Sequence, residues 1–319
     1  MVKKEKKSKN LIVAKLWTPI LLVVLLLIFG IQYPTFLSAN NIGNLLTQMT
    51  IMLIAAMGMS MILIMGSIDV SVGATLTFSG VISAMMVPVF GGFGIIFGIL
   101  VGAAIGLYNG LIATLLRIPT FLSTIAMMLI LNGVSVLLLK GSPLNIDCEA
   151  FMAVAKGHLI GNIPNTITIP IIVVIFTVLL LKKTGFGRSL YAIGNNEYVA
   201  QYSGINVIGT QILAFTIHGA LVGLAGGLQA SILEAACPYM GDTYTLSVIA
   251  IVVMGGISLS GGKGGPIGTV LGAILITVLI SGLNFMGVTP EIRDVAMGIL
   301  VIFGALTSSF GRPRNQTVK

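Results

Sequence analysis

Charged residues are scarce in this sequence. Only 8% of its 319 residues are aspartate, glutamate, lysine or arginine, whereas soluble domains carry about a quarter. Hydrophobic side chains make up 56% of the chain, and the mean hydropathy is +1.07. This balance excludes a soluble globular protein and indicates an integral membrane protein.

Metal-ligating and nucleophilic side chains are also few. The chain has two cysteines and two histidines, and neither Cys148 nor Cys237 stands at a metal-ligand spacing. A disulfide between these cysteines and two unrelated thiols both fit the sequence, and the second interpretation is preferred. The motifs of zinc proteases and serine hydrolases do not occur, so no catalytic or metal site is predicted.

A phosphate-binding loop is missing as well. Residues 255–266, GGISLSGGKGGP, are rich in glycine, but Ile257 stands where the motif needs its first glycine. Gly264 stands where a serine or threonine would have to bind magnesium. The segment therefore predicts a tight turn, and the chain is expected to have no ATPase activity and no cofactor of its own.

Long apolar runs fill most of the chain. Several reach the roughly 20 residues that a helix needs to span the hydrocarbon, and they lack the alternation of barrel strands. The third and eighth runs are short enough to be broken or half-crossing helices. We expect an all-α fold, a polytopic helix bundle with about ten transmembrane segments: 16–33, 45–65, 74–89, 91–116, 120–139, 166–181, 208–232, 246–259, 266–285 and 294–310.

The distribution of charge predicts the orientation of the bundle. With ten crossings and the N-terminus inside, fourteen of the seventeen lysines and arginines face the cytoplasm. The expected parts are a basic cytoplasmic arm at 1–15, one transmembrane domain at 16–310 with its main outer loop at 141–165, and a cytoplasmic tail at 311–319. The basic arm accounts for the net charge of +8 without a nucleic-acid partner.

The longest polar passage in the interior of the chain, residues 182–207, falls in the cytoplasm. Asn195 is predicted to cap a short helix that has Glu197 in its first turn and ends at Gly204. Val199, Tyr202 and Ile205 would form an apolar stripe on it. A helix of about two turns does not persist alone in water, so this stripe is expected to need a partner surface.

Glycine recurs at every fourth residue of the fourth segment. Such a series leaves a groove in which another helix backbone approaches closely. The seventh segment carries a similar series. Tight packing and a moving helix pair beside a transport path both explain the pattern, and tight packing is preferred. The residues are Gly94, Gly98, Gly102, Gly106 and Gly110, and in the seventh segment Gly219, Gly223 and Gly227.

A few polar side chains are expected at membrane depth. Asp69 stands with Ser71 and Gly73 where the second segment joins the third, and a carboxylate there is costly unless it is paired or used. It either caps the third segment or belongs to the transport path or its gate, and both interpretations stay open. Asn109 and His218 would contact a polar solute or bond between helices.

The segment around Asp69 has an echo in the second half of the chain. IMGSIDVSVG at 64–73 is followed 189 residues later by VMGGISLSGG at 253–262. Both are expected at inward-facing turns, so the echo hints at matched roles in the two halves.

Three motifs, in order, closely resemble those of the permease subunits of bacterial ATP-binding-cassette importers of the ribose, xylose and galactose type. They read MGSIDVSVGATLTFSG, YAIGNNEYVAQYSGINV and VIAIVVMGGISLSGGKGGPIGTVLGA. The resemblance implies a cell-membrane permease for a monosaccharide, paired with a second permease copy and fed by an extracytoplasmic binding protein. Separate ATPase subunits would bind ATP and magnesium. Alternatives are another small solute, such as autoinducer-2, a nucleoside or an amino acid, or a secondary transporter.

The resemblance also implies roles for particular residues. Asp69, Ser71 and Gly73 fall on a family motif after the second span, with Ser67 in place of a glycine. Asn196 stands where the family often has glycine or glutamate, so the helix cap could shift by one residue. The residues that fall on the cytoplasmic loop inserted into the ATPase are Gly194, Asn195, Asn196, Glu197, Ala200, Ser203, Gly204 and Ile205.

Overall fold

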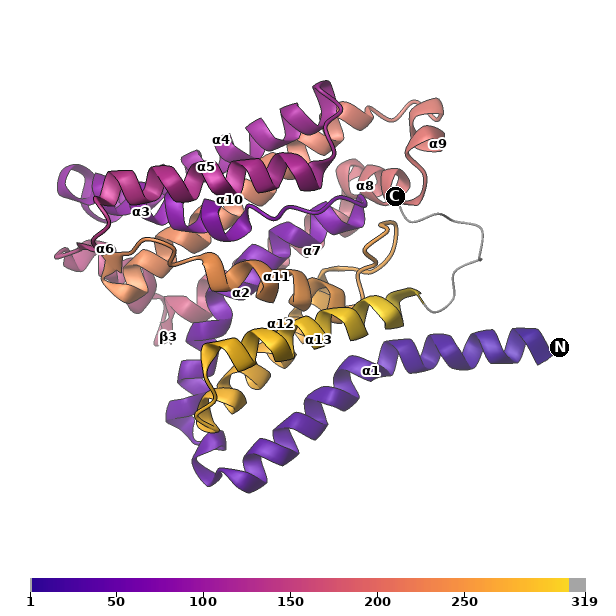
Figure 1. Ribbon diagram of the computed structural model, residues 1–319, viewed down its shortest axis with the longest axis horizontal. Helices are drawn as coiled ribbons and strands as arrows, with labels where there is room; N and C mark the ends of the chain where they lie inside the picture. The colour runs from indigo at the N-terminus through magenta and orange to yellow at the C-terminus, as the bar shows by residue number, and fades with distance from the viewer. Residues whose placement is uncertain (1, 310–319) are drawn as a thin grey trace.

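The computed structural model describes the backbone of residues 2–309 and the side chains of residues 17–306; the predicted tail at 311–319 lies outside the described residues. Figure 1 shows an arrangement of packed helices. In chain order they are α1 (Val2–Gln32), α2 (Ala39–Ile64), α3 (Val72–Phe90), α4 (Gly94–Leu115), α5 (Thr120–Leu139), α6 (Glu149–Lys156), α7 (Asn165–Lys183), α8 (Gly185–Asn195), α9 (Glu197–Tyr202), α10 (Val207–Leu233), α11 (Asp242–Met254), α12 (Pro266–Phe285) and α13 (Pro290–Ser309).

Every predicted apolar segment coincides with one of these helices. The ten are α1 to α5, α7, and α10 to α13. In the described part of the chain, six helical stretches are long and apolar enough to cross a membrane. The chain is therefore an all-α, polytopic membrane protein. Helix α1 begins well before residue 16, so the residues of the basic arm belong to the same continuous helix as the first apolar segment.

Helices α3 and α4 follow one another in a run of 44 residues, Val72–Leu115. About 20 residues already span the hydrocarbon, so this run is long enough for two crossings. The chain turns between them at the short helix η2 (Gly91–Phe93), where Gly91 has a φ of +54°. Helix α3 has 19 residues, whereas α11 has only 13 and stays short, as its sequence predicted.

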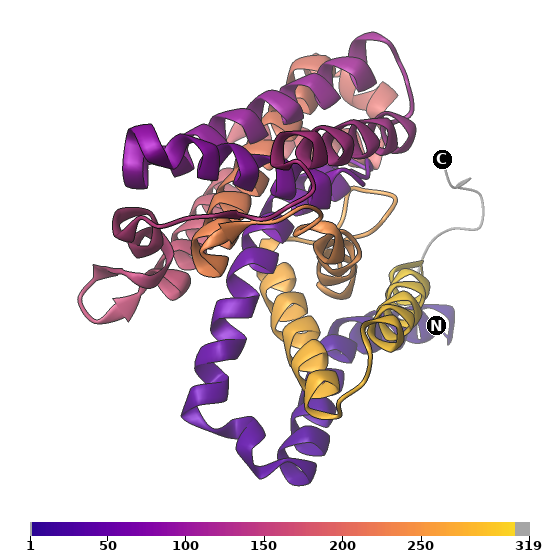
Figure 2. The same ribbon diagram turned by 60° about the vertical axis from the view of Figure 1, so that its left-hand side comes forward.

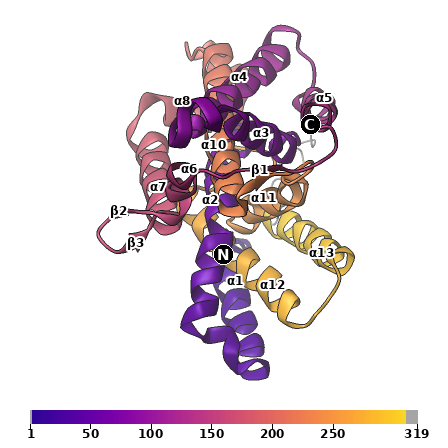
Figure 3. The same ribbon diagram turned by 90° about the vertical axis from the view of Figure 1, so that its left-hand side faces the viewer.

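Helix α10 lies at the centre of the bundle. It packs against α4, α3 and α2 (Figure 3). On the other side of α2 lie α11 and α12, and α1 and α13 pack onto these two (Figure 2). Helix α2 is apolar around almost its whole circumference from Ile51 to Ile64, with Ser60 as the one polar side chain, and every residue of this stretch is buried. A helix without a polar face belongs in such an interior.

Glycines bring α4 and α10 into backbone contact. A Cβ atom built at Gly102 would collide with the carbonyl oxygen of Gly219, and one at Gly106 with that of Phe215. The collision is mutual, because a Cβ at Gly219 would meet the carbonyl oxygen of Gly102. Gly98 and Gly110 also face α10, whereas Gly94 contacts α3 at the carbonyl oxygen of Ser83, 2.7 Å from its Cβ position.

The loop at 141–165 forms a cover at the end of the molecule opposite α8 and α9 (Figure 1). It contains the short helix α6. It also contains strand β1 (Leu144–Asn145), paired with β4 (Ala235–Ala236), and strand β2 (His158–Ile160), paired with β3 (Ile163–Pro164), which were not predicted. Phe151 and Ala155 of α6 are fully buried. Cys148 and Cys237 are free thiols, as preferred from the sequence.

The backbone contact between α4 and α10 predicts a specific sensitivity to added volume. Gly106→Ala should overpack the contact with Phe215 and lower the melting temperature of the detergent-solubilised protein by about 5 °C or more. Gly133→Ala on α5 is the matched control, because no atom lies within 4 Å of its Cβ position. There alanine should keep or slightly raise the melting temperature. Equal melting temperatures for both variants, measured by thermal-shift size exclusion, would contradict the packing role.

Candidate functional site

The chain leaves regular helix between α2 and α3. Helix α2 ends at Ile64, and Gly66 adopts a φ of +85°, which costs glycine little. The amide of Ser67 donates to the carbonyl of Ile62 at 3.0 Å, the backbone bond of a glycine-terminated helix end. Residues 65–71 then run as irregular chain from the exposed Gly66 to the buried Asp69 and Ser71. Irregular backbone within a membrane protein occurs where it is enclosed by protein.

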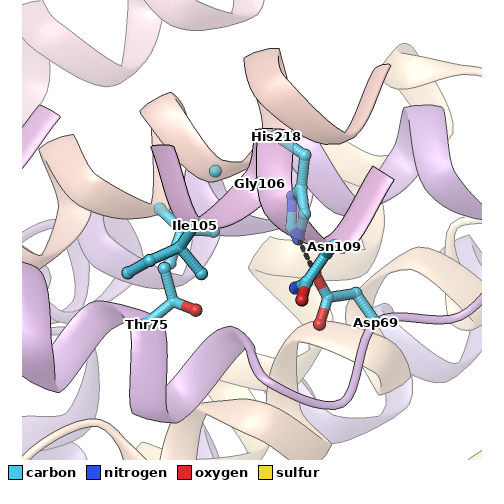
Figure 4. Close-up of a pocket in the computed structure, with 8 residues that line it drawn as sticks. Asp69, Thr75, Ile105, Gly106, Asn109 and His218 are labelled. Atoms are coloured by element: carbon cyan, nitrogen blue, oxygen red, sulfur yellow. Dashed lines mark ion pairs between the residues drawn. The ribbon is translucent and has the colours of Figure 1, made fainter. Parts of the chain in front are cut away.

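Asp69 is buried, with 3% of its surface exposed, and its two oxygens have different partners. Oδ1 accepts from the amide of Ser71 at 2.7 Å and from its hydroxyl at 2.6 Å. Oδ2 lies 3.5 Å from Nε2 of His218, which projects from α10 and is equally buried (Figure 4). One oxygen thus holds Ser71, the N-cap residue that precedes α3, and the other faces a histidine.

Ser71 joins Asn109 of α4 to this pair. The side-chain amide of Asn109 donates to the Ser71 hydroxyl at 3.1 Å, and that hydroxyl donates to Asp69. Four polar side chains from the α2–α3 junction, α4 and α10 therefore form one cluster, which we call the polar cluster: Asp69, Ser71, Asn109 and His218. The sequence proposed these residues together but gave no reason why they should meet.

Three residues of the polar cluster, Asp69, Asn109 and His218, line a small pocket. Apolar or small side chains close it, and it is too narrow to admit a water molecule. Eleven side-chain atoms in the described part of the chain are buried without a hydrogen-bond partner, and the polar cluster holds three of them: Oδ1 of Asn109 and both ring nitrogens of His218. Such atoms cost about 1–3 kcal/mol each. The pocket residues that the sequence did not single out are Thr75, Ile105 and Val222, while Gly106 and Gly219 were predicted only as packing glycines.

Gly73 lies apart from this pocket. Its amide donates to the hydroxyl of Thr245, and a Cβ there would collide with that hydroxyl and with the carbonyl oxygen of Gly241. Gly73 therefore packs α3 against the start of α11. A glycine that the sequence did not single out, Gly58 on α2, instead makes room for the histidine: its Cβ position is 2.6 Å from Nδ1 of His218.

The polar passage at 182–207 folds as two short helices. Helix α9 is the predicted one, but its cap is Asn196, whose Oδ1 accepts from the amide of Val199 at 3.1 Å. The prediction of Asn195 was wrong by one residue, because α8, which was not predicted, continues through Asn195. The Asn195 side chain donates back to the carbonyl of Tyr191 at 2.8 Å. Gly204, with a φ of +81°, ends α9 as predicted.

Helix α9 presents an apolar face to the outside. Tyr198, Val199 and Tyr202 are 68%, 59% and 91% exposed. Ile205, predicted in the same stripe, packs on the hydrophobic core instead, so the prediction of its place was wrong. The chain turns at Gly204, and this carries Ile205 inward. Ala200 is also buried, Glu197 is exposed in the first turn, and the Ser203 hydroxyl donates to the carbonyl of Val199 at 2.8 Å.

Comparison with known proteins identifies relatives along nearly the whole chain. Residues 41–305 match the family described as branched-chain amino acid transport system, permease component. The ribose import permease protein RbsC of Escherichia coli (strain K12) is 34% identical over 296 residues, 91% of this chain and 92% of that protein. RbsC of Bacillus subtilis (strain 168) is 37% identical over 89% of each chain.

A galactose-type relative is similar as well. The galactose/methyl galactoside import permease protein MglC of Escherichia coli (strain K12) is 33% identical over 93% of this chain and 94% of that protein. No solved structure matches the chain. Both sets of relatives confirm the resemblance that the three motifs showed. This chain belongs to the family of transport-system permease components, multi-pass proteins of the bacterial cell membrane.

Proposed function

We propose that this protein is the transmembrane permease subunit of an ATP-binding-cassette importer for a monosaccharide, a ribose-like pentose or a hexose. The observation that carries the proposal is the similarity to ribose and galactose import permeases over about nine tenths of both chains. The chain itself is not an enzyme in this proposal. ATP and magnesium bind to separate ATPase subunits, and no cofactor belongs to this chain.

Helix α9 supports docking of the ATPase. The two tyrosines and the valine of its exposed face are large apolar side chains on a two-turn helix, which gains stability from a partner surface. With ten crossings, the charge distribution puts α9, both termini and loop 255–265 in the cytoplasm. The cytoplasmic coupling loop at 182–207 would then enter the cleft of the ATPase, while a binding protein meets the outer loops at 141–165 and 234–242.

The polar cluster supports a role in the transport path. A sugar hydroxyl both donates and accepts hydrogen bonds, so it suits the amide oxygen of Asn109 and the imidazole of His218. The pocket between them is closed in this conformation. We assign the polar cluster to a gate that opens during the transport cycle. The contact of Asp69 with the Ser71 amide adds the capping role, and the two roles use different carboxylate oxygens.

Two permease copies would form the membrane part of the importer, as the resemblance implies. The family description favours a second candidate solute, a branched-chain amino acid. The outer loops carry more acidic than basic residues, which disfavours an anionic solute but excludes neither a neutral sugar nor a zwitterion. The curated relatives favour the sugar.

Reconstitution tests this function directly. Proteoliposomes should contain the permease with the ATPase and binding protein encoded by neighbouring genes, and uptake of labelled ribose, galactose and leucine should be measured. We expect sugar uptake that requires both ATP and the binding protein. ATP-independent uptake would contradict the importer and favour a secondary transporter. ATP-dependent uptake of leucine alone would contradict the choice of a sugar.

The gate predicts a loss of transport when the carboxylate of the polar cluster is neutralised. Asp69→Asn leaves a side chain of the same size but removes the charge that faces His218. The initial rate of uptake should fall by about tenfold or more, equivalent to about 1.4 kcal/mol on the barrier, at unchanged membrane expression. Glu291→Gln, which neutralises an exposed acid at the start of α13, is the control. Normal uptake by Asp69→Asn would show that the residue only caps α3.

The docking role of α9 predicts that changes in its first turn and at Gly204, which ends it, uncouple transport from ATP hydrolysis. Glu197→Lys reverses the charge at the positive helix end, and Gly204→Val forces a branched residue to a φ of +81°. Both should lower co-purification of the ATPase and ATP-dependent uptake by about tenfold, because each misplaces the exposed apolar face. Glu291→Lys makes the same charge change far from α9 and should have no effect. Full uptake by both α9 variants would leave 182–207 as a mere connector.

A further inference from the structure

The glycine-rich loop between α11 and α12, residues 255–265, has a defined shape. The amide of Ser258 donates to the carbonyl of Lys263 at 3.3 Å, and the amide of Gly261 donates to the carbonyl of Ser258 at 2.9 Å. Gly261 and Gly262 at its tip have φ values of +79° and +72°. Residues with side chains rarely adopt this region, so the glycines specify one tight turn.

The tip of this loop seals the end of α2. The amide of Gly262 donates to the carbonyl of Ile64 at 2.8 Å. Ile64 is the last residue of α2, where a carbonyl has no partner within its own helix. Gly66 lies close by, with its Cβ position 3.4 Å from the carbonyl oxygen of Ser260.

Helix α8 reaches the same point. A Cβ at Gly194 would collide with the carbonyl oxygen of Ile64 and come within 2.5 Å of the amide nitrogen of Gly262. The hydroxyl of Tyr191, one turn earlier, donates to the carbonyl of Gly264 at 2.9 Å. Burial raises the pKa of this hydroxyl, so it keeps the proton that it donates at neutral pH. Three separate segments thus meet through their backbones at Ile64, Gly194 and Gly262, which we call the glycine junction.

The two ends of the coupling loop at 182–207 lead to the two residues of the buried pair, Asp69 and His218. Helix α9 continues through Gly204 into α10, and His218 follows the first residue of α10 by eleven positions, about 16 Å along the helix. Helix α8 contacts Ile64 at the glycine junction, and Asp69 follows Ile64 by five residues. A displacement of α8 relative to α9 would therefore change the separation of Asp69 and His218.

We propose that the loop at 255–265 is a positioning element that links α8 to the segment carrying Asp69, through the contacts of Gly262 with Ile64 and of Gly264 with Tyr191. The proposal rests on the function proposed above. The contacts of Gly262 and Gly194 with Ile64 join backbone to backbone, so no flexible side chain lies between them to absorb a shift, and the Tyr191 hydroxyl adds a side-chain link to Gly264. ATPase closure on α8 and α9 then moves Asp69 through the glycine junction relative to His218, which stays with α10, and this separates the pair.

The test compares sugar transported per ATP hydrolysed in the reconstituted complex, with ribose and galactose as probes. Tyr191→Phe removes only the hydroxyl bond to Gly264, and this ratio should fall about threefold to fivefold, as for one lost hydrogen bond. Gly262→Ala strains the tip and should lower the ratio by about tenfold. In both variants the ATPase should still co-purify and still hydrolyse ATP. Controls are Tyr108→Phe, a half-exposed tyrosine on α4, and Gly133→Ala.

The outcomes separate this proposal from the importer itself. An unchanged ratio in both variants would overturn the link while leaving the importer intact. Parallel loss of ATP hydrolysis, co-purification and uptake would also overturn it, because the loop would then serve ATPase docking. If Gly262→Ala fails to fold, Tyr191→Phe decides alone, since it leaves all packing in place. Absence of ATP-dependent uptake in the unaltered complex would instead refute the proposed function.

Discussion

Helices in a lipid bilayer gain little from burying apolar side chains against one another, because the lipid tails are equally apolar. Close backbone approach, with the dispersion contacts it brings, has to hold such a bundle together. Helix α10 satisfies this condition on two faces. Gly219 and Gly223 meet the glycines of α4, and Gly226 meets the carbonyl oxygen of Leu76 on α3. The position of His218 within the bundle follows from this double contact.

The same membrane environment explains why the polar cluster contains few residues and why these residues bond to one another. A buried polar group without a partner costs about 1–3 kcal/mol, and water is not available at this depth to supply one. Asp69 accepts two hydrogen bonds from Ser71 and lies 3.5 Å from His218, and the Ser71 hydroxyl accepts a hydrogen bond from Asn109. Within the described residues, Oδ1 of Asn109 and both ring nitrogens of His218 keep no hydrogen-bond partner. The cluster is therefore stable enough to form yet retains unused bonding capacity on Asn109 and His218.

Much of the fold could be predicted from the sequence, because apolar run length is a local property. All ten runs became helices, and the spacing of Gly98 to Gly110 correctly indicated a close helix contact. Local reasoning failed where a neighbour decided the outcome. Asn195 and Asn196 are chemically identical as caps, and only the length of α8 chose between them. Ile205 had the spacing of the stripe, but the turn at Gly204 redirected it.

The site shows the same limit. Asp69, Asn109 and His218 were candidates because polar groups at membrane depth are rare, yet nothing in their spacing showed that they would meet. Their meeting depends on which glycine faces pair, and several faces were available. The contact of residues 255–265 with Ile64 was equally invisible, because a glycine-rich turn has no side-chain pattern that indicates its partner. The echo of 64–73 in 253–262 lies at corresponding helix ends. Gly66 follows the end of α2 and Gly256 follows the end of α11, with similar φ values of +85° and +82°. The two glycines are 190 residues apart, one more than the sequence echo suggested.

Opening of the pocket requires Asp69 and His218 to move apart, and the elements that carry them have unequal numbers of backbone contacts. Moving α10 would break its backbone contacts with α3 and α4 together. It would also disturb the close contact between Gly58 of α2 and His218 of α10. The segment at 65–71 is irregular and has few backbone bonds to lose. It is anchored at one end by the glycine junction and at the other by the start of α3, where the carbonyl of Ser71 accepts from Thr75 at 2.7 Å. The least costly route to an open pocket is therefore displacement of Asp69 with its segment while His218 stays with α10, and that segment is the one that the junction with α8 reaches.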